Sequence, residues 1–216
     1  MLHLFALVPH PGRLPGESGA LELVQVDESV DAVASEVGDG ARDADRAAVL
    51  QHAGVVDELT RMNEAVLPAR FGPSYADADA LRSAIRSRRE QLVEALERVR
   101  GCVEVGLRVF DPAAASEPDA GTSGRDYMVR RLERVRAAER LGQDLEELAA
   151  NAKASNQNVL ANADLVLTAA YLVPREDFGS FCDALDAFGR SRAPLTFVRT
   201  GPWPPYSFAV VDGPPS

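Results

Sequence analysis

The chain has 216 residues, 46% of them hydrophobic and 26% charged, so it is long enough for one large domain or two small ones. Its formal net charge of −10 argues against nucleic-acid binding, because such binding depends on Lys and Arg side chains that neutralise phosphates. No stretch approaches the roughly 18 apolar residues of a membrane span, and the apolar N-terminal run lacks the features of a signal peptide. We therefore expect a cytoplasmic protein that binds neither nucleic acid nor a lipid membrane.

The first half of the chain alternates between strand and helix patterns. The predicted strands cover residues 2–8, 21–26 and 103–109, and the predicted helices cover residues 43–63 and 77–100. Short apolar runs or strict alternation indicate the strands, and apolar residues at helical spacing indicate the helices. Residues 28–41 fit either an extended strand or a short helix.

The segment VLPARFGPSY, residues 66–75, interrupts this pattern. Pro68 lacks a backbone donor, so the segment is expected to be an edge strand that leads into a loop. Arg70 lies between apolar residues and precedes Phe71. Either Arg70 forms a surface salt bridge, or the two side chains anchor an interface, where arginine and aromatic residues are enriched.

The second half of the chain predicts a linker and then a smaller set of elements. The prediction gives a linker over residues 111–124, a long amphipathic helix over 125–152, a strand over 163–173, a helix after Pro174 and a final strand that begins at Pro194. The Ala, Ser, Pro and Gly content of the linker and its lack of periodicity set it apart. The strand at 163–173 is apolar on both faces.

These elements predict an α+β protein with two domains. The N-terminal domain, residues 1–110, fits a ferredoxin-like plan. Residues 111–124 form the linker. The C-terminal domain, residues 125–216, combines the long helix with a small α+β sheet.

No catalytic, cofactor or metal site is predicted from the residue spacing. His3, His10 and His52 share no metal-ligand spacing, so each is expected to have a structural or surface role. Cys102 and Cys182 are far apart and are expected to be small core residues rather than a disulfide or a nucleophile. Phosphate-binding and nucleophile motifs are absent from the sequence.

The C-terminal stretch GPWPPYSF, residues 201–208, contains the single tryptophan and three prolines. The prolines favour an extended or polyproline conformation, which loses little entropy on docking. We expect Trp203 to pack on the sheet of the second domain, with Tyr206 and Phe208 at its margin. The stretch is then either a structural clasp or a binding surface.

Four motifs together resemble the gas vesicle proteins of the F/L type. They are VLPARFGPSY, the strand CVEVGLRVF, the helix start GRDYMVRR at residue 124 and the closing GPWPPYSF, which is the most specific of them. The resemblance covers most of the chain in the same order. It implies a two-domain α+β accessory protein, not an enzyme, that is associated with gas vesicles. It also implies partners, namely the hydrophobic A-type shell protein and other accessory proteins, with a role in nucleation or assembly.

A very apolar shell protein needs apolar patches or open strand edges on any partner that holds it before assembly. The residues expected to bind partners are Leu67, Pro68, Arg70, Phe71, Trp203, Tyr206 and Phe208. No cofactor is expected.

Two alternatives remain open from the sequence. Paired ferredoxin-like units can form an α+β barrel enzyme that binds a small molecule or haem, with His3 or His52 as the axial ligand. A homo-oligomeric scaffold is the other alternative, in which the helix over 125–152 pairs with its copy.

Overall fold

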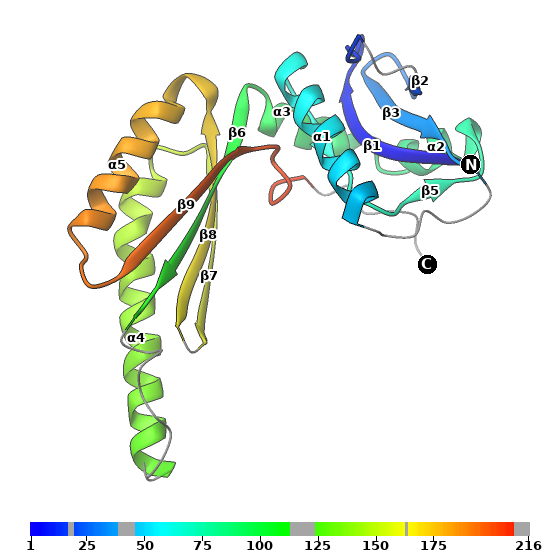
Figure 1. Ribbon diagram of the computed structural model, residues 1–216. Helices are drawn as coiled ribbons and strands as arrows, with labels where there is room; N and C mark the ends of the chain where they lie inside the picture. The colour runs from blue at the N-terminus through cyan, green and yellow to red at the C-terminus, as the bar shows by residue number, and fades with distance from the viewer. Residues whose placement is uncertain (17–19, 39–45, 113–123, 163, 210–216) are drawn as a thin grey trace. The chain divides into compact units, whose positions relative to one another are not determined.

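The structure is a computed structural model that describes residues 1–16, 20–38, 46–112, 124–162 and 164–209 (Figure 1). Contacts along the chain group it into two compact units. The first unit comprises Met1–Cys102 and the C-terminal segment from Pro204, and the second comprises Val103–Trp203. Most of the predicted linker, from residue 113 to 123, lies outside the described residues.

The first unit is built on a five-stranded antiparallel sheet. Its strands are β1 (Leu2–Pro9), β2 (Leu21–Gln25), β3 (Val30–Glu36), β4 (Leu67–Pro68) and β5 (Ser74–Tyr75). The order is β2-β3-β1-β4, and β5 also pairs with β1. Side chains from Leu2 to Val8 are all buried, which explains the uninterrupted apolar run of this central strand. Within the ambiguous segment at 28–41, residues 30–36 form the strand β3, and residues 39–41 lie outside the described residues.

Three helices pack in the first unit: α1 (Arg46–Met62), α2 (Ala78–Arg86) and α3 (Arg89–Val99). The prediction of one continuous helix after Asp77 was wrong, because the helix breaks at Ser87 and Arg88. The apolar stripe has no member between Ile85 and Leu92, so a break there costs no core contact. Asp77 caps the start of α2, with its carboxylate accepting from the Ala80 amide at 2.8 Å.

The second unit contains a four-stranded sheet in the order β7-β8-β6-β9. Its strands are β6 (Cys102–Phe110), β7 (Ala154–Asn162), β8 (Leu165–Pro174) and β9 (Thr196–Trp203). The helices α4 (Gly124–Ala149) and α5 (Phe178–Arg190) cover one face of this sheet (Figure 1). The buried core includes Leu107, Leu145, Leu167, Tyr171 and Phe181.

Two features of this sheet differ from the sequence prediction. The predicted N-terminal domain included residues 103–109, but β6 pairs with β9 of the second unit, with Arg108 opposite Val198. The strand β7 was not predicted, because its Asn and Gln residues look like those of a loop. It pairs with β8 along most of its length and turns Val159 toward the core.

Candidate partner-binding site

The segment between β4 and β5, residues 69–73, interrupts the strand pairing with β1 and is called the arch. Pro68 pairs with Ala6 before the arch, and Ser74 pairs with His3 after it. Both ends are therefore fixed to β1. Gly72 has a φ of 123°, a conformation that side chains rarely adopt, and so permits the return of the chain.

Two hydrogen bonds fix the first residue of the arch. The Ala69 amide donates to the Phe5 carbonyl oxygen at 2.8 Å, and Nε2 of His52 lies 2.9 Å from the Ala69 carbonyl oxygen. A carbonyl oxygen only accepts, so His52 carries a hydrogen on Nε2. In the neutral ring Nδ1 is then an acceptor, and it lies 2.9 Å from Nε2 of His3. The protons assigned from these partners form a chain of donors from His3 through His52 to Ala69.

Aromatic rings surround this histidine pair. Phe5 stacks on His52, with ring centroids 5.0 Å apart, and Phe71 packs against both histidines at 5.4 and 5.6 Å. Each histidine is only 2% exposed, while Phe71 is half-buried. One side of the Phe71 ring therefore covers the pair, and its remaining surface faces solvent.

The structure separates the four residues predicted in this segment into two roles. Leu67 and Pro68 are buried and pair with β1, so their side chains support the arch. Arg70 is exposed and Phe71 is half-exposed. Arg70 makes no ion pair with any described residue, so the first of the two alternatives, a surface salt bridge, is not formed among them.

The C-terminal motif begins as strand rather than as a segment laid on a sheet. Trp203 is the last residue of β9, lies opposite Glu104 and is 47% exposed. The expectation that Trp203 packs on the sheet was therefore wrong, because it belongs to the edge strand itself. Gly201 adopts a φ of 113°, and a Cβ there would lie 2.7 Å from the Glu104 carbonyl oxygen.

After Trp203 the chain turns and returns to the first unit. Pro204 and Pro205 are buried there, and the Phe208 amide donates to the Pro205 carbonyl oxygen at 3.1 Å. Pro204 and Pro205 therefore lead into a turn, because such bonds close the chain on itself, whereas Pro202 lies in the extended strand β9. Phe208 is buried rather than marginal.

Tyr206 is the exposed member of this turn. The residue is 37% exposed, while burial and the negative charge of Asp57 raise the pKa of its hydroxyl to about 12. Solvent still reaches part of Tyr206, so it stays available for contact.

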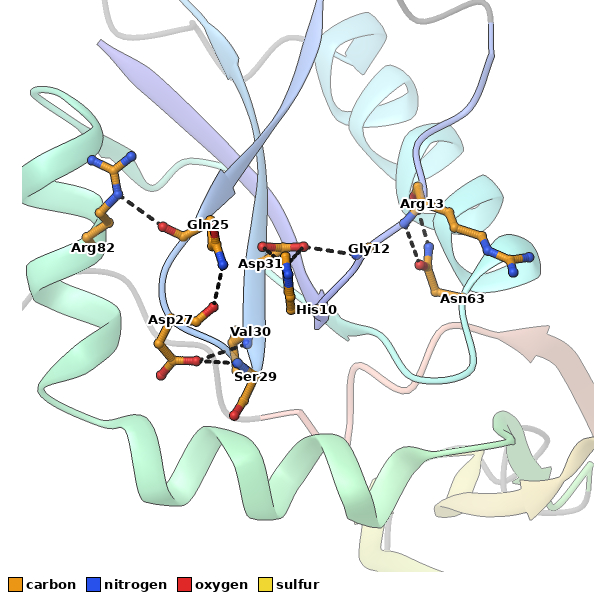
Figure 2. A network of polar contacts seen from close by, with 10 residues as sticks. All are labelled: His10, Gly12, Arg13, Gln25, Asp27, Ser29, Val30, Asp31, Asn63 and Arg82. Carbon is orange, nitrogen blue, oxygen red and sulfur yellow. Dashed lines mark hydrogen bonds and ion pairs between the residues drawn. The ribbon is translucent and has the colours of Figure 1, made fainter.

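A polar network missed by the sequence analysis fastens the loop after β1 (Figure 2). Asp31 on β3 is buried, accepts from the Gly12 amide at 2.9 Å and lies 3.0 Å from Nδ1 of His10. Asn63, just after α1, exchanges two hydrogen bonds with the backbone of Arg13. These partners are 19 to 50 residues apart, so spacing gave no signal. Asp31 is the only described side chain bonded to His10, and the pair therefore serves to hold the loop.

The hairpin between β2 and β3 is held by a carboxylate and by arginines. Asp27 accepts from the Ser29 and Val30 amides at 2.7 and 3.1 Å and from Nε of Arg89 at 2.7 Å. Burial opposes the charge, but these hydrogen bonds outweigh it and lower the pKa of Asp27. Arg82 and Arg86 donate to backbone carbonyl groups of the same hairpin. The helices α2 and α3 are therefore hydrogen-bonded to the β2–β3 hairpin at the edge of the sheet.

The chemistry available at these places is limited. The described residues contain no group of three His, Cys, Asp or Glu side chains that could hold a metal ion. Both cysteines are buried, and burial raises the pKa of Cys182, as expected for core residues. His3 and His52 bond to each other through the nitrogens that face one another, which leaves neither of those atoms for an axial ligand. None of the described helices is long and apolar enough to cross a membrane.

Comparisons with known proteins find gas vesicle proteins that match most of the chain. The family model "Gas vesicle synthesis protein GvpL/GvpF" matches residues 2–210. Gas vesicle protein L of a Streptomyces species is 34% identical, over 93% of this chain and 81% of its own. Gas vesicle protein F1 of Halobacterium salinarum is 28% identical, over 91% of this chain and 85% of its own.

A solved structure has the same fold. The crystal structure of gas vesicle protein GvpF from Microcystis aeruginosa superposes with a TM-score of 0.77, at 20% identity, over 97% of this chain and 99% of that chain. The α+β class with two antiparallel sheets is thus shared with GvpF.

Proposed function

Because the chain belongs to the GvpL/GvpF family of gas vesicle synthesis proteins, we propose that it is a non-enzymatic accessory protein that binds the hydrophobic A-type shell protein during nucleation or assembly. Other gas vesicle proteins are further partners. The observation that carries this proposal is the family match over residues 2–210. A cytoplasmic, gas vesicle-associated location and a two-domain plan with a ferredoxin-like N-terminal domain belong to the same proposal.

The partner-binding residues in this proposal are Arg70 and Phe71 on the arch, Tyr206 in the C-terminal turn and Trp203 on β9. Each of them offers at least part of its side chain to solvent. Arginine and large aromatic side chains contribute most of the energy at protein interfaces. Leu67, Pro68 and Phe208 act indirectly, because they are buried and hold these side chains in place.

The arch suits this role because it is ordered before binding. Pairing with β1 on both sides and the bond from His52 to Ala69 fix its backbone. A fixed backbone loses little conformational entropy when a partner binds, so more of the contact energy becomes affinity.

The edge strand β9 offers a different kind of contact. It lies at the end of the strand order, and Val198 and Trp203 on it are exposed. An extended segment of an apolar partner can add to such an edge through backbone hydrogen bonds. The hydrophobic shell protein is the proposed donor of that segment.

Co-purification with the shell protein tests the proposal. We expect the double variant Phe71→Ala with Trp203→Ala, and Arg70→Ala alone, to retain about tenfold less shell protein than the unchanged chain. Leu50→Ala is the matched control, because Leu50 is an exposed apolar residue on α1. Circular dichroism checks the fold of each variant. Shell-protein binding that is unaltered in the double variant contradicts this choice of residues, and no binding by the unchanged chain contradicts the function.

A further inference from the structure

The first half of α4 differs from its second half. Among the described side chains of residues 125–137 none is buried, whereas Ala138, Leu141 and Leu145 are buried in the second unit. At 1.5 Å per residue this open part of the helix is about 20 Å long. A helix of that length is marginal alone in water.

The open half carries an apolar patch. Met128, Val129 and Leu132 are 62%, 49% and 49% exposed. Residues three and four positions apart lie side by side on a helix, so the three side chains form one surface. Three of the exposed large hydrophobic side chains of the described residues thus fall within five consecutive positions.

The charge around this patch is opposite to that of the protein. Residues 125–140 contain six arginines and three acidic residues, a net charge of +3. The whole chain carries −10, so the remaining residues carry −13. Arg125 and Arg136 lie four positions from Val129 and Leu132, and therefore border the patch on the same face.

We propose that the open half of α4 binds an acidic amphipathic helix of a partner protein. Apolar residues of the partner pack on Met128, Val129 and Leu132, and its carboxylates pair with the arginines that border them. Complementary charge steers such an encounter and selects the partner. The proposal stands on the helix itself and does not depend on binding to the shell protein.

The same charges disfavour two other occupants. If a second copy bound through the same half helix, the arginines of the two copies would face each other. Their like charges would repel and weaken the contact. An anionic lipid surface attracts the arginines but repels the rest of the chain, which carries a net charge of −13. In addition, three apolar residues bury little area in a bilayer.

Fluorescence anisotropy with a labelled synthetic peptide tests the proposal on the full chain. The probe is an amphipathic helix with leucines on one face and glutamates on the other, and the control peptide has lysine at each glutamate position. We expect binding to the glutamate peptide that weakens as salt is added, and at least tenfold weaker binding to the lysine peptide.

Variants locate the site. Met128→Gln with Leu132→Gln, and separately Arg125→Glu with Arg136→Glu, should each weaken binding at least tenfold. The controls Leu50→Gln on α1 and Arg98→Glu on α3 change exposed side chains elsewhere and should keep the affinity within about twofold.

Five results overturn the proposal. Three of them are equal binding of the two peptides, unchanged affinity in both α4 variants, and no binding at concentrations on the order of 100 μM. The other two are tighter binding to phosphatidylglycerol vesicles than to the peptide, and self-association that Met128→Gln with Leu132→Gln abolishes, since either assigns the patch to another occupant.

Discussion

The two units of the chain hold buried polar groups in different ways. In the first unit His3, His52, Asp31 and Asn63 are buried, and each is hydrogen-bonded to a segment distant in sequence. In the second unit the core is apolar, and the buried hydroxyl of Tyr171 has no partner among the described atoms. The first unit therefore uses buried polar groups to fix loops and the arch. The second depends on apolar packing, while a buried hydroxyl without a partner among the described atoms occurs in each unit, at Ser35 and at Tyr171.

The stability of each unit has to be measured separately. A chain with two units need not unfold in one step, so a single free energy of unfolding can mix both. Hydrogen exchange of amides in β1 reports on the first unit, and exchange in β8 reports on the second. Each substitution below is expected to act mainly on the unit that contains it.

The largest effect is expected for His52→Leu. The change removes the donor to Ala69 and the acceptor for His3, so two buried polar groups lose their partners. We expect a loss of about 3 kcal/mol in β1 exchange stability. The arch also loses its anchor, so trypsin should cleave after Arg70 faster. Leu50→Ala is the control, since Leu50 is an exposed residue on the same helix. Unchanged exchange and cleavage would falsify the assigned chain of donors.

Asp31→Ala should have the next largest effect. The Gly12 amide and His10 both lose their buried acceptor, which costs about 2 kcal/mol in β1 exchange. Asp31→Asn keeps an oxygen that can accept from the Gly12 amide and should recover part of the loss. If the two variants behave alike, the oxygen acceptor is not what holds the loop.

The apolar patterns predicted the strands and helices better than they predicted the contacts between them. The runs at β1 and β6 reflect buried strands, and the sequence placed both within two residues. The strand β7 was missed because Asn156 and Asn158 lie on its exposed face, where polarity is normal for an edge strand. Its strand state comes from pairing with β8, which no local pattern encodes.

The candidate site was predicted by composition and only partly by geometry. The exposed position of Arg70 fits the interface interpretation from the sequence, but the exposure of Trp203 and the turn that buries Phe208 do not follow the sequence expectation. The pairing of His3 with His52 joins residues 49 positions apart and has no local signal. One clue existed, because His52 lies four positions before Val56 on the buried face of its helix.

Tyr171→Phe should stabilise the second unit. The hydroxyl is buried without a partner, so its removal is expected to raise β8 exchange stability by about 1 kcal/mol at neutral pH. A decrease would mean that the hydroxyl is satisfied in solution.

The same residue predicts a loss of stability at high pH. Burial raises the pKa of Tyr171 to about 12, from an ordinary value of 10.0. The unfolded chain therefore loses this proton first, and stability falls as the pH rises from 10 to 12, by up to about 3 kcal/mol. Tyr171→Phe should remove that part of the alkaline loss. Tyr206 contributes less, because solvent reaches part of the residue. An unchanged alkaline loss in the variant contradicts this assignment.

The smallest effect is expected for Asp186→Asn in the second unit. Both oxygens of Asp186 on α5 accept from Arg199 on β9, at 3.2 and 3.1 Å, and this contact lowers the pKa of Asp186. A lowered pKa adds stability above the ordinary value of 3.8, and that stability is lost as the pH falls through the folded pKa. The pair is largely exposed and screened, so the loss at neutral pH should be below about 1 kcal/mol.

Hydrogen exchange in β9 should show this loss of stability at neutral pH but not in strong acid, and added salt should reduce the loss. An effect that persists in acid would assign the contribution to packing instead, because a protonated carboxyl group can no longer pair with the guanidinium.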